Sequence, residues 1–185
     1  VDDHLKSRME GKIKQVDVKL AYCDKKTYDR DELKKKLSIE NDYKVAFIFA
    51  HIFKDSPHLS KGILFKDYYV WLKETIKFVS TVENINWIIK PHPSAPVYNE
   101  IGAVEEMIKE VQNKNKNKNK NKNKNKNIYL CPDDFSTNSI KNTADVIITA
   151  QGTVGIEFSC LGIPTIIVGS PFYSRFGFTI EPETI

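Results

Sequence analysis

Short runs of apolar residues recur along this chain and alternate with segments of helical periodicity. Five runs are almost continuously apolar, which is typical of strands buried on both faces of a parallel sheet. They are residues 44–50, 87–89, 128–130, 146–148 and 165–168. Turn-forming or polar residues follow these runs, so we expect five separate strands.

The segments between the runs repeat their apolar residues at helical spacing. Residues 65–82 are the clearest case, with Tyr68, Tyr69, Leu72, Ile76 and Val79 recurring along one helix. Further helices are predicted over residues 98–112, from about 133–136 to 142, and over 154–161. In the last of these, Ile156, Cys160 and Leu161 are expected to face the core.

This alternation predicts an α/β fold. We expect a Rossmann-like parallel sheet of about five strands with helices on both faces. Ligands of such folds bind outside the carboxyl ends of the strands. Three of the four histidines and most of the prolines follow predicted strands, so the unusual local chemistry gathers at that edge.

The first forty residues are predicted to be a linker or N-terminal appendage, and residues 41–185 the Rossmann-like domain. Ile13, Val16, Val18 and Leu20 suggest a strand or an extended linker, and residues 29–37 a short helix capped by Asp29 or Asp31. The chain begins with valine, so we also expect a piece of a longer protein.

The net charge of +4 comes from one segment. Alternating Asn and Lys fill residues 113–127 and supply 7 of the 28 basic residues, which leaves 21 basic against 24 acidic residues elsewhere. A segment without apolar residues cannot bury a face, so we expect disorder or a solvated extension of the preceding helix. Nucleic-acid binding is therefore not expected of the domain.

Several common sites are absent from the sequence. It contains no GxGxxG, no Walker lysine motif and no GxSxG, which argues against dinucleotide oxidoreductases, P-loop NTPases and α/β-hydrolases. No apolar run reaches the eighteen residues of a membrane span. The three cysteines are far apart, and Cys131 and Cys160 are expected to be buried fillers.

A glycine-threonine turn follows the fourth predicted strand. Gly152 and Thr153 precede a predicted helix, whose first N–H groups and dipole favour an anion such as phosphate. Glu157 lies four residues after Thr153 and hence on the same helical face. A carboxylate one turn from a phosphate can accept hydrogen bonds from ribose hydroxyls.

The second candidate motif is K-P-H-P at residues 90–93. Two prolines restrain the backbone around His92, whose ring can donate to a phosphoryl oxygen, and Lys90 adds a positive charge. A stiff loop with a solvated histidine is the alternative. His51 and Asp55 follow the first strand and could contact a sugar or an acceptor. Asp133 and Asp134 are better explained as helix caps than as metal ligands, so no metal site is predicted.

Four motifs in order carry a family resemblance. They are K-P-H-P (90–93), T-V-G-I-E (153–157), G-I-P (162–164) and P-F-Y (171–173) with Gly177 and Thr179. Together they resemble the C-terminal half of bacterial GT-B glycosyltransferases, and within these the capsule polysaccharide biosynthesis group, which includes Kdo transferases that use CMP-Kdo. Ile156 stands where this group usually has an aromatic residue.

The resemblance implies the donor-binding half of a glycosyltransferase. Such a domain binds a nucleotide sugar, here CMP-linked and Kdo-like, whose sugar is moved to a glycan or glycolipid acceptor of a bacterial capsule or cell surface. No cofactor and no obligatory metal are implied. The acceptor site and the catalytic base would lie in an N-terminal half, so this chain alone is expected to be inactive. The resemblance also implies a cytoplasmic protein, with peripheral association with the inner membrane through the full-length protein.

The implied roles fall on named residues. Lys90 and His92 would bind the phosphate or a sugar carboxylate, Gly152 and Thr153 the phosphate, and Glu157 the ribose. The base or sugar would lie near Ser170, Phe172, Tyr173 and His51. Three alternatives stay open: a CDP-glycerol-type glycerophosphotransferase, an enzyme similar to UDP-GlcNAc 2-epimerase, and a non-catalytic nucleotide-sugar-binding module.

Overall fold

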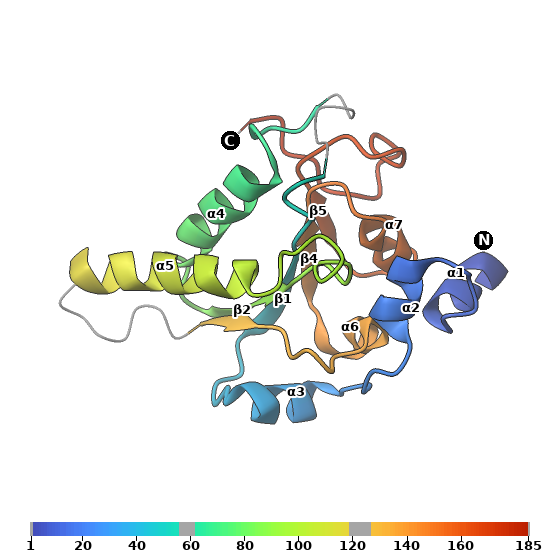
Figure 1. Cartoon of the computed structure of the whole chain (residues 1–185), viewed down its shortest axis with the longest axis horizontal. Coiled ribbons are helices and arrows are strands. Elements are labelled where there is room, and N and C mark those ends of the chain that lie inside the picture. Colours follow the sequence, from blue (N-terminus) through green and yellow to red (C-terminus); the bar gives the residue numbers. More distant parts are fainter. Residues whose placement is uncertain (1, 56–61, 119–126, 185) are drawn as a thin grey trace.

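Five parallel strands form one sheet in the computed structural model, which describes residues 2–55, 62–118 and 127–184 (Figure 1). The strands are β1 (Lys44–Phe49), β2 (Ile85–Lys90), β3 (Ile128–Leu130), β4 (Val146–Thr149) and β5 (Thr165–Ile167). All five predicted strands are present, and each boundary lies within two residues of the predicted one. The predicted fold class is therefore confirmed.

The order of the strands is β3-β2-β1-β4-β5. The chain moves outward from β1 to β3 and then returns to place β4 on the other side of β1. The junction between β1 and β4 is thus a topological switch point, where α/β folds form a crevice at the carboxyl ends of the strands. Phe49, the last residue of β1, is in register with Lys90 of β2 and Thr149 of β4, so these three ends are level.

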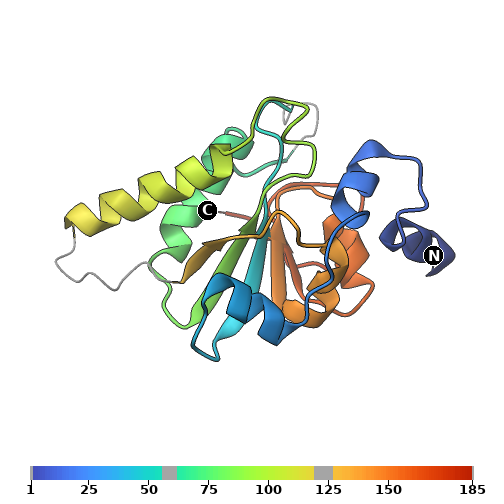
Figure 2. The same cartoon turned by 60° about the horizontal axis from the view of Figure 1, so that its bottom comes forward.

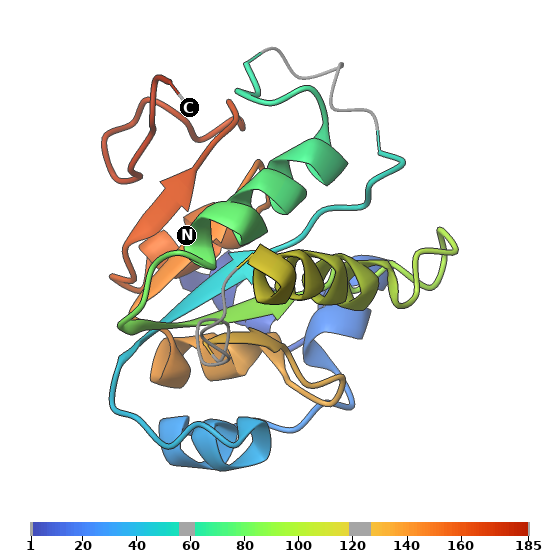
Figure 3. The same cartoon turned by 90° about the vertical axis from the view of Figure 1, so that its left-hand side faces the viewer.

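Two long helices cover one face of the sheet (Figure 3). They are α4 (Tyr68–Val79) and α5 (Ala103–Lys118), and they enclose a core cluster that includes Trp71, Leu72 and Met107. Helix α4 begins where the side chain of Asp67 accepts a hydrogen bond from the N–H of Val70. Helix α5 begins five residues later than predicted because residues 94–102 form turns, and Gly102 there has a positive φ of 79°.

Helix α5 continues into the Asn/Lys repeat as far as Lys118. A helical extension was one of the two structures expected for that segment. Residues 119–126 lie outside the described residues, so for them the expected disorder or helical extension stays a prediction.

The opposite face carries shorter helices: α3 (Arg30–Leu37), the 3-10 turn η2 (Thr137–Ser139), α6 (Ile140–Thr143) and α7 (Val154–Ser159). Leu33, Phe135, Ile140 and Phe158 form the second core cluster there. Asp29 caps α3 through a reciprocal bond with Glu32, as one of the two predicted caps. The sheet therefore lies between two helical layers.

The N-terminal segment is helical, which corrects the predicted strand or extended linker. Helices α1 (Asp2–Met9) and α2 (Val16–Tyr22) lie beside α6 and α7 (Figure 2). Val18 and Tyr22 are buried, whereas Val16 and Leu20 are exposed. The buried pair is four residues apart, so α2 presents one helical face to the domain rather than alternate positions of a strand.

The core-facing side of α7 also differs from the prediction. Phe158 and Gly155 are buried, whereas Cys160 and Leu161 are exposed and Ile156 is half-buried. Cys131 is buried as predicted, so the interpretation of the cysteines as fillers holds for Cys131 and is wrong for Cys160.

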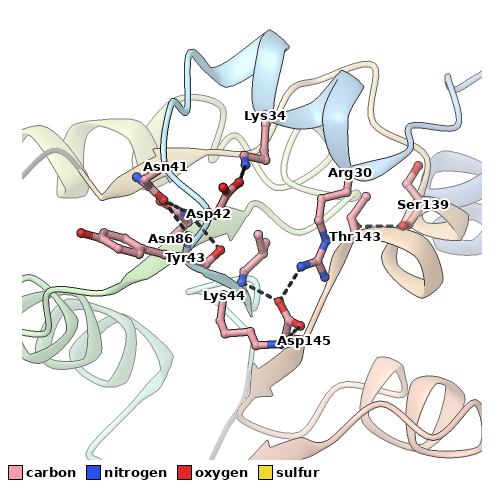
Figure 4. A network of polar contacts seen from close by, with 11 residues as sticks. Arg30, Lys34, Asn41, Asp42, Tyr43, Lys44, Asn86, Ser139, Thr143 and Asp145 are labelled. Carbon is pink, nitrogen blue, oxygen red and sulfur yellow. Dashed lines mark hydrogen bonds and ion pairs between the residues drawn. The ribbon is translucent and has the colours of Figure 1, made fainter.

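A polar network ties the amino ends of the strands together (Figure 4). Asp145 accepts hydrogen bonds from the Val45 N–H at 2.8 Å and from Lys44 at 3.1 Å, and it pairs with Arg30 of α3 at 3.0 Å. Asn86 donates to Asn41 at 2.8 Å. This network lies at the end of the sheet opposite the crevice, so it fixes the scaffold and leaves the carboxyl ends for ligands.

Candidate functional site

Two adjoining cavities lie at the carboxyl ends of the strands, and a third adjoins the first of them between α1 and α7. The central cavity, about 100 Å³, is lined at its base by His51, Lys90, His92 and Thr149. The proline-loop cavity, about 410 Å³, shares Lys90 and His92 and extends past Pro96 and Glu100. The α1–α7 cavity, about 390 Å³, is bounded by Leu5, Ile156, Cys160 and Phe172.

His51 organises the turn after β4. Its Nε2 atom accepts the N–H of Gln151 at 3.1 Å, so the proton of the neutral ring is on Nδ1. The ring stacks on Tyr68 with 4.3 Å between centroids. Burial, with a smaller contribution from His92, lowers the pKa of His51 to about 4, so the imidazole is uncharged at neutral pH.

Lys90 is the last residue of β2 and is 8% exposed. Its ammonium lies 5.6 Å from the centroid of the Phe135 ring, and no described residue offers it a hydrogen bond or an ion pair. Burial lowers the pKa of this amine. Lys90 lines both the central and the proline-loop cavities, so an anion there would meet a cation that forms no ion pair with a described residue.

His92 is held in one tautomer by the loop that follows it. Its Nδ1 atom accepts the N–H of Ser94 at 3.1 Å, so the proton of the neutral ring is on Nε2. Burial lowers the pKa of His92. The ring lines the central cavity between Pro91 and Pro93, and its Nε2–H has no partner among the residues that the structure describes. Lys90 and His92 thus bring two hydrogen-bond donors to one small space.

The turn at Gly152 and Thr153 lies on the opposite wall of the central cavity. The N–H of Gly152 donates to the hydroxyl of Thr149 at 3.2 Å, so one of the amides predicted to face an anion has an internal partner. A Cβ at Gly152 would come 2.9 Å from that same hydroxyl, which explains the glycine. Thr153 is exposed, and its hydroxyl accepts a hydrogen bond from Arg8 at 3.3 Å.

Glu157 is buried and paired, which the sequence did not reveal. One carboxylate oxygen accepts from Arg8 Nε at 2.9 Å, and the other accepts from the Tyr22 hydroxyl at 2.6 Å. Burial and the charge of Glu157 raise the pKa of Tyr22. Both partners come from the first 22 residues, where no site residue was predicted. The spacing of Arg8 and Tyr22 carries no signal for a contact 135 or more residues away.

The residues of the P-F-Y motif are divided by the fold. Tyr173 is buried, and its hydroxyl donates to the carbonyl of Gly152, which fixes the turn. Burial raises the pKa of Tyr173. Phe172 is 76% exposed and lines the α1–α7 cavity. The hydroxyl of Ser170 is directed to the carbonyl of Gly62, and Ser170 lines none of the three cavities.

The predicted site residues therefore lie around one centre with three exceptions. Lys90, His92, Gly152, Thr153, Glu157 and His51 line the central cavity. Phe172 lines the adjoining α1–α7 cavity, and Ser170 and Tyr173 line none of the three cavities. Thr137 of η2 was missed, although its buried hydroxyl has no partner in the described chain and it lines the central cavity.

No group of three metal-ligating side chains occurs within residues 2–55, 62–118 and 127–184. Asp134 accepts from the Tyr28 hydroxyl at 2.7 Å. Across the same described part of the chain, no helix is both long and apolar enough to cross a bilayer.

The comparisons with known proteins give likenesses in structure alone. No protein-family profile and no curated protein matches this chain. The KpsC beta Kdo 2,7 transferase of Thermosulfurimonas dismutans has a TM-score of 0.53 at 16% identity, over 97% of this chain and 50% of its own. The KpsC beta Kdo 2,4 transferase of the same organism has a TM-score of 0.55 at 16% identity, over 99% and 48%.

A trehalose-6-phosphate synthase, OtsA, has a TM-score of only 0.43 at 9% identity, over 82% of this chain and 34% of its own. The chain spans about half the length of the two Kdo transferases that it matches. At such identities the likeness shows the fold. This chain has the fold of one Rossmann-like half of a GT-B glycosyltransferase.

Proposed function

We propose that this chain is the donor-binding half of a glycosyltransferase, which moves a sugar from a nucleotide-activated donor to a bacterial capsule or surface polysaccharide. A CMP-linked, Kdo-like donor is favoured by the four sequence motifs and by the two Kdo transferases with the same fold. The observation that carries the proposal is the pair Lys90 and His92. Both line one cavity at the topological switch point, and neither the ammonium nor the Nε2–H has a hydrogen-bond partner among the described residues.

The phosphate of the donor would occupy the central cavity. The ammonium of Lys90 and the Nε2–H of His92 would donate to its oxygens from one wall, and Thr153 would face it from the other. Charge-assisted hydrogen bonds of this kind are short and strong. They would stabilise the negative charge that builds on the phosphate as the sugar departs, and the proposal therefore requires no metal.

The reaction class follows from the donor. The oxygen of an acceptor hydroxyl bonds to the anomeric carbon, the bond between that carbon and the phosphate oxygen breaks, and the nucleoside monophosphate leaves with the electron pair. The acceptor proton passes to a base. We expect that base, and the acceptor site, in the other half of a GT-B protein.

The space available suits a nucleotide sugar. The central cavity, about 100 Å³, has room for little more than the phosphate, but cavities of about 410 and 390 Å³ open on either side of it. Ligand sites typically measure about 300–1,000 Å³. The base and the sugar would lie in the two flanking cavities. Glu157, predicted to bind ribose, lines both the central and the α1–α7 cavities.

Thermal unfolding with nucleotides tests this proposal. CMP or CDP at millimolar concentration should raise the Tm of the chain more than UDP or NAD does. A ligand at about 100 times its Kd adds about 2.7 kcal/mol, which corresponds to roughly 5–10 °C for a chain of this size. The absence of a shift with any nucleotide would overturn the donor site.

Substitution in a full-length transferase separates catalysis from simple binding. His92→Ala should remove most sugar transfer, because the departing phosphate loses a donor, and should leave the Tm without nucleotide nearly unchanged. His58→Ala is the matched control, since the sequence gives His58 no role. Full transfer by His92→Ala would contradict the role proposed for His92 at the departing phosphate.

A further inference from the structure

The guanidinium of Arg8 lies at the junction of two cavities. Arg8 lies in the last turn of α1 and lines both the central and the α1–α7 cavities. Its Nε donates to Glu157 at 2.9 Å, one terminal nitrogen to Gln15 at 2.9 Å, and the other to Thr153 at 3.3 Å. Its side chain is 13% exposed, so three contacts fix the plane of the group inside the site.

The guanidinium retains hydrogen-bonding capacity. An arginine has five N–H donors in a planar fork, and the three contacts above use one on each nitrogen. Each terminal nitrogen therefore keeps one N–H that meets no described acceptor. These two N–H groups can donate to the oxygens of a phosphate, which arginine commonly binds.

Further hydrogen-bond donors surround Arg8 in the central cavity. The same cavity is lined by the ammonium of Lys90 and the buried hydroxyl of Thr137, neither of which has a hydrogen-bond partner among the described residues. Glu157 pairs with Arg8, the carboxylate of Asp17 also lines the cavity, and Lys90 forms no ion pair with a described residue. Donors from three separate segments thus surround a space of about 100 Å³. Hydrogen-bond donors gathered in this way can bind the oxygens of a phosphate.

We propose that Arg8 is a phosphate-binding residue of the donor site, supplied by the N-terminal helix, and that Glu157 and Gln15 position its guanidinium. The inference rests on the proposed function. It assigns Glu157 a positioning role and makes α1 and α2 a wall of the site. Arg8 and Lys90 would hold the phosphate from opposite sides.

Isothermal titration of the 185-residue chain with CMP and with cytidine tests this role. Cytidine lacks the phosphate, so a residue that binds phosphate should affect CMP alone. Arg8→Ala should weaken CMP binding about tenfold to hundredfold, as expected for loss of a hydrogen bond to a charged group. Cytidine binding should be unchanged.

Two further variants keep the test decisive if Arg8→Ala disturbs α1. Arg8→Lys keeps the charge next to Glu157 but lacks the fork, so CMP binding should fall by an intermediate factor. Lys6→Ala removes the same charge from an exposed position of the same helix and should leave CMP binding within twofold of the wild type.

The outcomes are distinct. Equal losses for CMP and cytidine in Arg8→Lys would show a merely structural clamp and overturn the inference. Tighter CMP binding by Arg8→Ala would show that Arg8 obstructs the site, which also overturns it. Wild-type CMP affinity in Arg8→Ala would overturn the inference about Arg8 but leave the proposed function in place. Failure of the wild-type chain to bind CMP would overturn both.

Discussion

The ammonium of Lys90 combines burial with the lack of a described partner. Such a charge costs stability in the absence of a ligand. We predict that Lys90→Met raises the unfolding free energy by about 1–2 kcal/mol, since a methionine fills similar volume without a charge. The same change should remove the Tm shift produced by CMP.

Urea unfolding and thermal unfolding with CMP measure these two effects. Lys66→Met, at an exposed position, should change neither quantity. A less stable Lys90→Met variant would mean that the ammonium is already satisfied in the folded protein, against the role proposed for it.

His51 predicts a dependence of stability on pH. The unfolded chain protonates this imidazole near its ordinary value of 6.5, whereas burial lowers the folded pKa to about 4. Between these values the unfolded state binds more protons, so acidification favours unfolding. From pH 7 to pH 5 this single group should lower the unfolding free energy by about 2 kcal/mol.

His51→Gln isolates that contribution. Glutamine offers an acceptor near the position of Nε2 for the N–H of Gln151 and does not titrate. The pH dependence of urea unfolding should therefore shrink in this variant. His4→Gln, at an exposed position, should leave it unchanged, and an unaltered slope in His51→Gln would contradict the buried neutral imidazole.

Single residues could be predicted where the chemistry is local. Proline on both sides of His92, and glycine before Thr153, mark these positions in the sequence, and both line the central cavity. The pairing of Glu157 could not be predicted in this way. Its partners Arg8 and Tyr22 come from separate N-terminal helices, and only the packing of those helices brings them to α7.

Helix α7 packs against the loop after β5 through a close contact between Gly155 and Tyr173. A Cβ at Gly155 would come 2.1 Å from the hydroxyl of Tyr173, the same hydroxyl that donates to Gly152. Gly155→Ala must displace Tyr173 and break that bond. We predict a loss of about 2–3 kcal/mol, which combines overpacking with a lost hydrogen bond.

A double-mutant cycle in urea checks this contact. Tyr173→Phe alone should cost about 1 kcal/mol, because it leaves the Gly152 carbonyl without its donor. In the Gly155→Ala background it should cost much less, since the bond is already broken. Strict additivity would show that the two residues do not act through each other.

Elements could be predicted where the hydrophobic pattern allows one interpretation. Apolar runs such as that of β1 indicate strands buried on both faces, and the structure confirms them. In α2 the apolar residues alternate with Asp17 and Lys19, which is a strand pattern, yet the segment is helical. Only Val18 and Tyr22 need burial there, so packing against η2 decided the outcome.

At the scale of the molecule, the fold class could be predicted but the order of the strands could not. An alternation of strands and helices specifies a parallel sheet, whereas the return of the chain to place β4 beside β1 is a choice of topology. That choice creates the switch point with His51 on one side and Thr149 on the other. The division of the chain at residue 40, into an N-terminal appendage and a Rossmann-like domain, remains a prediction.

The packing of α3 allows that division to be tested. Leu33 is 1% exposed and lies in the core cluster that also contains Phe135 and Phe158. The two tryptophans, Trp71 and Trp87, belong to the cluster on the other face of the sheet. If the first forty residues fold as one cooperative unit with the domain, damage at Leu33 must reach the tryptophans through the sheet.

We predict that the first forty residues fold as one cooperative unit with the domain. Leu33→Ala should then lower the unfolding free energy of the whole unit by about 3 kcal/mol, as is usual for a large cavity in a core. Tryptophan fluorescence and far-UV circular dichroism should then show one coincident transition, shifted equally to lower urea. Leu20→Ala, at an exposed position of α2, should shift neither signal. A different outcome would be that Leu33→Ala moves only part of the dichroism transition and leaves the fluorescence transition in place. Residues 1–40 would then be an independent appendage. In that case α1 and α2, which line the proposed donor site, could unfold separately from the domain.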